Sequence, residues 1–232
     1  MVDEPTARRG AGGRQRLSDK AASYVRGLIM SGQLRPGAGV RPEIVGQALG
    51  ISATPAREAL QALRVEGFLL SVPQQGFQVA PLTGQDIRDL FQAQALIAGE
   101  LAARAARAAT QSQVRELEAL HHELIAAAAR NDHPQLEEKN HAFHREINLV
   151  AGSPRIAGVL GMLTRYVPHD FYAEITGWPR ATIDDHEQIL RGIQIRDADH
   201  SRQAMQRHIT HAGELLARHF EERSPDGAGL RP

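Results

Sequence analysis

The chain has 232 residues, which is enough for one or two domains with a substantial hydrophobic core. Its 27 basic and 27 acidic residues balance, and the absence of cysteine excludes disulfides, thiolate metal sites and cysteine nucleophiles. No apolar run approaches the roughly 18 residues of a membrane-spanning helix, and the N-terminal segment lacks the apolar core of a secretory signal. We therefore expect a cytoplasmic protein without a membrane partner.

The charges are unevenly distributed along the chain. Residues 1–80 contain ten basic and six acidic side chains, whereas residues 81–232 contain 17 basic and 21 acidic side chains. A basic N-terminal part fits a nucleic-acid-binding module. Residues 1–16 are rich in glycine and arginine, and we predict that they form a disordered arm.

Residues 17–80 are predicted to form the first domain. An apolar stripe predicts a helix from Ser18 to about Ser31. Two shorter helical patterns follow and meet at Gly50, where glycine permits a sharp turn. Ser52 or Thr54 can cap the second of them.

The second short helix carries Arg57, Gln61 and Arg64 at spacings of four and three, so these side chains share one polar face. Such a face suits a helix that enters the DNA major groove, although a simple helical hairpin with a solvated face would give the same pattern. Two alternating runs, 68–72 and 77–80, then predict a β-hairpin around the turn 73–76. A helix-turn-helix followed by a hairpin is the arrangement of a winged helix-turn-helix.

This stretch resembles the DNA-binding domain of GntR-family transcriptional regulators. The resemblance is carried by 52–60, Leu63, Glu66, Gly67 and the wing glycine Gly76, with 32–37 matching the turn after the first helix. It implies a homodimer that reads the two half-sites of a double-stranded DNA operator. Arg57 is our first choice for a contact with a base edge, because arginine pairs with guanine through two hydrogen bonds. The full set of predicted DNA-binding residues is Arg57, Thr54, Arg64, Ser52, Gly76, Arg35 and Arg41.

Residues 83–223 are predicted to be entirely helical. Thr83, with Asp86 three residues later, is typical of a helix N-terminus. Apolar periodicity and turn signals predict helices at about 83–109, 111–130, 131–151, 154–167, 179–197 and 199–222, with a frayed end from 224 to 232. We therefore predict a mainly α protein, with an N-terminal winged helix-turn-helix and a C-terminal antiparallel bundle of six to seven helices.

Histidines in three of these helices form a candidate metal site. Asn140 and His144 are four residues apart and project from one face of a helix, while His186 and His208 lie in the last two helices. Three imidazoles and one oxygen ligand can bind a divalent cation such as Zn²⁺, Ni²⁺ or Mn²⁺. His141 could replace Asn140 as the inward residue, and the chain's 11 histidines offer other chance pairs.

The segments 140–156 and 184–190, together with His208, resemble the FCD ligand-sensing domain of FadR-type GntR regulators. The resemblance implies that Asn140, His144, His186 and His208 hold a divalent metal, zinc being our first choice, beside a small carboxylate effector. Asn140 stands where the family more often has aspartate, and Gln94 stands near a frequent arginine. We predict Gln94 and Arg145 as effector-binding residues.

These observations predict a metabolite-responsive transcriptional regulator, most simply a repressor, rather than an enzyme. Two alternatives stay open on sequence alone. A three-histidine site with open positions could activate water in a metal-dependent enzyme. A DNA-binding protein that responds to no ligand would leave the histidines without a regulatory role.

Overall fold

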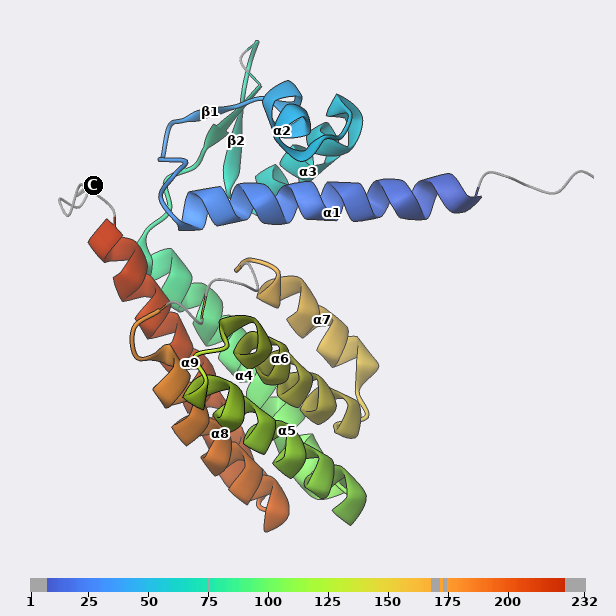
Figure 1. Cartoon of the computed structure of the whole chain (residues 1–232), viewed down its shortest axis with the longest axis vertical. Coiled ribbons are helices and arrows are strands. Elements are labelled where there is room, and N and C mark those ends of the chain that lie inside the picture. Colours follow the sequence, from blue (N-terminus) through green and yellow to red (C-terminus); the bar gives the residue numbers. More distant parts are fainter. Residues whose placement is uncertain (1–7, 75, 168–171, 173–174, 224–232) are drawn as a thin grey trace, which may run out of the picture. The chain divides into compact units, whose positions relative to one another are not determined.

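The computed structural model describes residues 8–74, 76–167, 172 and 175–223 (Figure 1). The chain divides into two compact units, with the main boundary between Leu82 and Thr83. Within the described ranges the fold is mainly helical, with nine helices and one small antiparallel sheet, which confirms the predicted fold class. None of the helices described is long and apolar enough to cross a membrane.

The first unit is built on three helices, α1 (Arg8–Met30), α2 (Pro42–Leu49) and α3 (Ala53–Val65). Gly50 ends α2 in the left-handed conformation, with φ 65°, as the turn between the two short helices requires. Apolar side chains on α1 and α3 form the core, among them Ala21, Val25, Ile29, Ala56, Leu60 and Leu63. The buried face of α3 leaves its opposite face open to solvent.

The start of α1 differs from the sequence prediction. We predicted a disordered arm over 1–16, but the helix begins at Arg8, while residues 1–7 lie outside the described part. The glycines at 10, 12 and 13 disfavour a helix here, but a helix that is anchored by its buried stripe further along can extend without a new nucleation step, and the arginine, alanine and glutamine residues around them are good helix formers. Residues 13–17 are all exposed, so this extension adds nothing to the core.

The wing is a three-stranded sheet with the order β1-β3-β2. The predicted hairpin is present as β2 (Leu69–Val72) and β3 (Gly76–Val79), with Leu69 opposite Val79 and Val72 opposite Gly76. The two-residue strand β1 (Gly39–Val40) pairs with the other edge of β3 and was not predicted, because its length is too short for a recognisable alternation. The predicted turn includes residue 75, which lies outside the described residues.

The second unit is a bundle of six helices within its described residues. They are α4 (Gly84–Ala108), α5 (Gln111–Ala129), α6 (His133–Val150), α7 (Pro154–Thr164), α8 (Trp178–Gln194) and α9 (Ala198–Arg223). The long helices α4 and α9 pack along each other, and α8 also packs on α9, while α5 and α6 form a second pair (Figure 1). The predicted helix at 154–167 is shorter in the structure, since α7 ends at Thr164.

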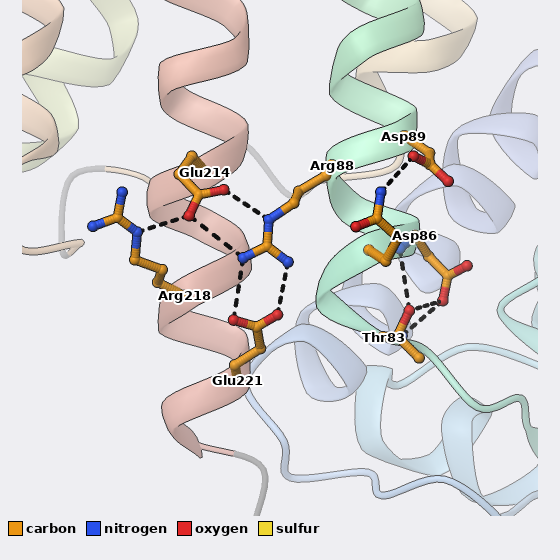
Figure 2. A network of polar contacts seen from close by, with 8 residues as sticks. Thr83, Asp86, Arg88, Asp89, Glu214, Arg218 and Glu221 are labelled. Carbon is orange, nitrogen blue, oxygen red and sulfur yellow. Dashed lines mark hydrogen bonds and ion pairs between the residues drawn. The ribbon is translucent and has the colours of Figure 1, made fainter. Parts of the chain in front are cut away.

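A network of ion pairs joins α4 to α9 (Figure 2). The guanidinium of Arg88 contacts the carboxylates of Glu214 and Glu221, with the shortest distance to each 2.7 Å, and Arg218 contacts Glu214 at 2.9 Å. Close by, Thr83 caps α4 through the capping box with Asp86 that its sequence indicated. The hydrogen bonds of Arg88 to both carboxylates lower the pKa of Glu214 and of Glu221. The first turns of α4 are therefore tied to the last turns of α9.

Candidate functional site

The exposed face of α3 carries three of the residues predicted to read DNA, Thr54, Arg57 and Arg64. Ala56, Ala59 and Leu60 are buried against the rest of the first unit. Their burial turns Thr54, Arg57 and Arg64 outward, and Ser52, Gly76, Arg35 and Arg41 are exposed as well. All seven predicted contacts are thus open to solvent, as a nucleic-acid-binding surface requires.

Two contacts on this surface orient the arginines. The Arg57 guanidinium lies 3.4 Å from a carboxylate oxygen of Glu43 on α2, and both side chains remain exposed. Arg64 donates a hydrogen bond to the side-chain oxygen of Gln61, one turn before it, at 3.1 Å. Ser52 occupies the N-cap position of α3, but its hydroxyl makes no capping hydrogen bond. A hydroxyl and two guanidinium groups on one surface are suitable partners for phosphates and base edges.

Three histidines meet inside the bundle. His144 of α6, His186 of α8 and His208 of α9 each offer a ring nitrogen, and these nitrogens all lie within 4.8 Å of one another. The Nε2 atoms of His144 and His208 are 3.1 Å apart. Nitrogens bound to one tetrahedral Zn²⁺ would be separated by about 3.3 Å, given Zn–N bonds of about 2.0 Å, so the cluster is close to a ligand arrangement.

Asn140 lies one helical turn before His144, on the inward face of α6. It is 8 % exposed, and its side-chain oxygen has no hydrogen-bond partner. His141, the alternative inward residue, is only partly buried. The buried side-chain oxygen of α6 that has no partner and lies one turn from His144 is therefore that of Asn140.

Packing fixes the His186 ring in the core. The ring is fully buried and stacks on Phe143 of α6, with ring centroids 4.2 Å apart and planes 16° apart. The rings of His144 and His208 approach it edge-on, at 5.1 Å and 4.7 Å between centroids. Neither nitrogen of His186 has a hydrogen-bond partner, and Nδ1 of His208 has only a long contact, 3.5 Å, with a carboxylate oxygen of Asp185. Buried polar atoms without partners are rare in proteins, and a metal ion would satisfy several of these at once.

The protonation states suit metal binding. Burial, as the larger cause, and the charge of the nearby His208, as the smaller cause, lower the pKa of His144 and of His186 well below the usual histidine value. Partial burial raises the pKa of Asp185, but hydrogen bonding and charge attraction from His208 and His211 outweigh it, and the net pKa is lowered. Neutral imidazoles are the form that coordinates metal, and a carboxylate beside His208 is a common orienting partner of a metal-bound histidine.

The two predicted effector contacts differ in their surroundings. Gln94 of α4 is buried, and its amide donates a hydrogen bond of 3.3 Å to the Leu163 carbonyl of α7. Arg145 is exposed on α6. Gln94 is therefore better placed than Arg145 to contact a molecule in the bundle interior, because its amide is buried and makes only one long hydrogen bond.

The structure adds one residue that we did not predict. His121 of α5 is 6 % exposed, its Nδ1 has no hydrogen-bond partner, and its ring centroid lies 6.2 Å from that of His186. In the sequence, His121 and its neighbour His122 formed one of several histidine pairs that could arise by chance. Its place in the stripe of Leu117 and Leu124, both fully buried, was the only signal that it faces inward.

Comparison with known proteins agrees with both halves of the structure. Residues 17–79 match the protein family described as "Bacterial regulatory proteins, gntR family", and residues 89–211 match the FCD domain family. The chain belongs to the GntR family, in its FadR-type branch. This GntR regulator is 25% identical over 197 residues to the HTH-type transcriptional repressor RspR of Escherichia coli, covering 82% of this chain and 85% of that protein.

Solved structures share the fold. The structure of E. coli McbR/YncC superposes with a TM-score of 0.67 and 22% identity, covering 88% of this chain and 98% of that one. The Listeria monocytogenes protein Lar superposes with a TM-score of 0.59 and 15% identity, over 87% of this chain and 96% of that one. The two matching family domains and the relative RspR make this protein a DNA-binding transcriptional regulator with an FCD domain rather than an enzyme.

Proposed function

We propose that this GntR regulator is a cytoplasmic, homodimeric repressor whose FCD domain binds a divalent metal and a small carboxylate effector. The observation that carries the proposal is the cluster of His144, His186 and His208, with the unpartnered oxygen of Asn140 one turn away. The relative RspR is named as a repressor, which supports repression rather than activation as the mode of regulation. The domains proposed for these roles are 17–80 for DNA and 83–223 for metal and effector.

The proposed metal ligands are Asn140, His144, His186 and His208. Three nitrogens and a neutral oxygen fit Zn²⁺ best, with Ni²⁺ or Mn²⁺ as further possibilities. When bound, such an ion would supply a positive centre, and a carboxylate could join the four protein ligands as a fifth, since zinc sites can expand beyond four-coordination. Burial lowers the pKa of His144 and of His186, which keeps these two imidazoles neutral, and stacking on Phe143 fixes the His186 ring, so these ligands are arranged before a metal arrives.

The effector would be held by the metal and by hydrogen-bond donors around it. Gln94 is the stronger candidate because it is buried, whereas Arg145 is exposed. An amide donor contributes no charge, so we expect most of the carboxylate recognition to come from the metal. Effector binding then favours one conformation of the regulator, which changes its affinity for the operator.

DNA reading is assigned to the exposed face of α3 and the wing. Arg57 would contact a base edge, while Thr54, Arg64, Ser52, Arg35 and Arg41 would contact phosphates or sugar edges, and Gly76 lets the wing approach the backbone. A homodimer would present two such surfaces to the two halves of a palindromic operator. Support for the dimer comes from α7, where Val159 and Met162 are 44 % and 58 % exposed and are three residues apart.

The test is a thermal-shift screen of zinc-loaded and chelator-stripped protein against small carboxylates. A ligand at about 100 times its dissociation constant adds roughly 2.7 kcal/mol of stability. We expect a carboxylate to raise Tm in the loaded protein only, and the same compound to weaken operator binding in a gel-shift titration. No metal effect on the melt would contradict the metal site, and tighter operator binding would contradict repression relieved by the effector.

A further inference from the structure

Five buried side-chain atoms in the described part of the chain lack a well-formed hydrogen bond, and they belong to one region of the bundle. One of them, Nδ1 of His208, still lies 3.5 Å from a carboxylate oxygen of Asp185. Four of them are on Asn140, His186 and His208, which are proposed metal ligands. The fifth is Nδ1 of His121, which comes from a different helix, α5. An unpaired buried polar atom costs about 1–3 kcal/mol, so its retention next to the other four calls for a partner.

The His186 ring cannot be satisfied by the metal alone. Both of its nitrogens are buried and unpartnered, and a metal can take only one of them. One ring face is covered by Phe143, and the edges of His144 and His208 lie at the metal side. His121, with its centroid 6.2 Å away and its plane tilted by 44°, is a further buried polar side chain near the ring, and its own Nδ1 is unpartnered. His121 is therefore a candidate partner for the second nitrogen of His186.

The distance between the two rings selects the kind of contact. A direct hydrogen bond between two imidazoles would place their centroids at most about 5 Å apart, and one bridging water would place them about 6–7 Å apart. The observed 6.2 Å fits the bridge. His121 is not a direct ligand, because among the described residues the nitrogens that lie within 4.8 Å of one another are those of His144, His186 and His208.

We propose that His121 is a positioning residue that, through one bound water, holds the second ring nitrogen of His186 and so orients His186 toward the metal. This inference rests on the proposed metal site. The water bonds to Nδ1 of His121 and to the free nitrogen of His186, which satisfies two of the buried atoms and fixes the tautomer of His186. Outer partners of this kind are typical of metal-bound histidines, and their loss weakens metal binding 10- to 100-fold.

The experiment measures Zn²⁺ affinity of the full chain by competition with a chromophoric chelator. We expect His121→Phe and His121→Leu to weaken binding about 10- to 100-fold, and His121→Gln to stay within about threefold of wild type, because its amide can still bond a water. His122→Phe is the matched control: His122 is exposed and adjacent, so the same substitution there should leave the affinity unchanged. The two apolar variants differ in shape, so at least one is expected to fold.

Two further measurements separate positioning from other roles. The melting temperature of the metal-free protein should not fall in His121→Leu, because the change removes an unpaired buried atom, whereas a purely structural role would lower it and leave zinc affinity intact. The absorption spectrum of the Co²⁺-loaded variant should keep its shape, while a changed spectrum would make His121 a ligand. Wild-type zinc affinity in both apolar variants overturns the inference alone, and absence of zinc binding in the wild type overturns the proposed metal site together with it.

Discussion

At the scale of single residues, Asn140 limits the charge that the histidine cluster offers to a cation. His144 and His186 are kept neutral by burial, which lowers the pKa of each, and the Asn140 amide carries no charge. A carboxylate at this position would add one negative charge in a buried setting where charge interactions are strong. In the proposed metal site, most of the affinity would therefore come from the nitrogen ligands.

We expect Asn140→Asp to tighten Zn²⁺ binding by roughly tenfold, which corresponds to about 1.4 kcal/mol. Chelator competition measures the change. Gln135→Glu introduces the same charge in the first turn of the same helix and serves as the control, with no expected effect on affinity. Equal tightening in both variants would mean that the gain comes from overall charge and not from a ligand at position 140.

Arg57 is the residue on which sequence-specific DNA binding should depend most. It is exposed on α3, and its only described ion pair is the exposed contact with Glu43. Replacing it with alanine should weaken operator binding by about 1–3 kcal/mol and relax discrimination at one base pair, because a bidentate contact with guanine is lost. Fluorescence anisotropy with wild-type and base-substituted operators tests both effects.

Arg35→Ala is the informative comparison for that experiment. If Arg35 contacts a phosphate, its replacement by alanine should weaken binding to all DNA sequences alike. The slope of the logarithm of affinity against the logarithm of salt concentration should also fall by about one unit. Arg107→Ala, on an exposed position of the FCD domain, removes the same charge away from the DNA-binding unit. If Arg57→Ala behaved like Arg35→Ala, the assignment of Arg57 to a base edge would be wrong.

The sequence singled out the three histidines that meet in the structure but not the whole of their environment. The spacing of Asn140 and His144 put both on one face of a helix, whereas the meeting of α6, α8 and α9 came only from the family resemblance. His121 was not singled out, because helical periodicity gives a position's face and not the helix that packs against it. Whether an inward histidine finds a partner depends on tertiary packing, which no local pattern contains.

At the scale of helices and strands, local signals were most informative where side chains contact their own backbone. The capping boxes at Thr83 and Thr110 begin α4 and α5, and the left-handed Gly50 ends α2. The strand β1 could not be predicted in the same way, since its two residues gain their structure from pairing with β3. The N-terminal extension of α1 is likewise set by a helix that is anchored further along.

The Arg88 network predicts how acid affects the FCD domain. The hydrogen bond from Arg88 lowers the pKa of Glu221 below its usual value. A carboxyl group with a lowered pKa in the folded state stabilises the protein above the unfolded-state pKa, and this contribution is lost as the pH falls through the folded-state value. Because the pair is partly exposed, we expect Glu221→Gln to lower Tm by only about 2 °C at pH 7.

The pH dependence is the sharper part of that prediction. The difference in Tm between wild type and Glu221→Gln should shrink as the pH is lowered below about 4.5, because the wild-type glutamate then becomes protonated and is uncharged like the glutamine. Glu222→Gln removes an exposed charge at the neighbouring position and should show no such pH-dependent difference. A Tm difference that stayed constant between pH 7 and pH 3.5 would show that the charge of Glu221 does not stabilise the folded protein through its ion pair with Arg88.

At the scale of the whole molecule, α7 is the helix whose composition and exposure disagree. Residues 156–164 contain no charged side chain, yet within α7 only Leu160 is buried. A helix that is apolar on all sides normally lies inside a protein or an assembly. A charge-free surface can also pack against a second copy of itself across a two-fold axis without repulsion between like charges. These properties support α7 as part of the proposed dimer interface.

Glutamate at this surface should separate the subunits. We expect Met162→Glu and Val159→Glu each to raise the dimer dissociation constant by at least about 100-fold, because each interface would bury two unpaired carboxylates. Sedimentation velocity across a protein dilution series measures the constant. Ile195→Glu replaces another exposed apolar residue, 62 % exposed at the end of α8, and should leave the dimer intact.

The same variants connect assembly to DNA reading. A dimer with two α3 helices gains its affinity for a palindromic operator from two half-sites held at a fixed spacing, whereas each α3 alone binds only one. Met162→Glu should therefore weaken binding to the full operator strongly while binding to an isolated half-site changes little. If full-operator affinity survived in a protein that sedimented as a monomer, operator recognition would not require the dimer. If Met162→Glu remained dimeric, the interface would have to lie on a surface other than α7.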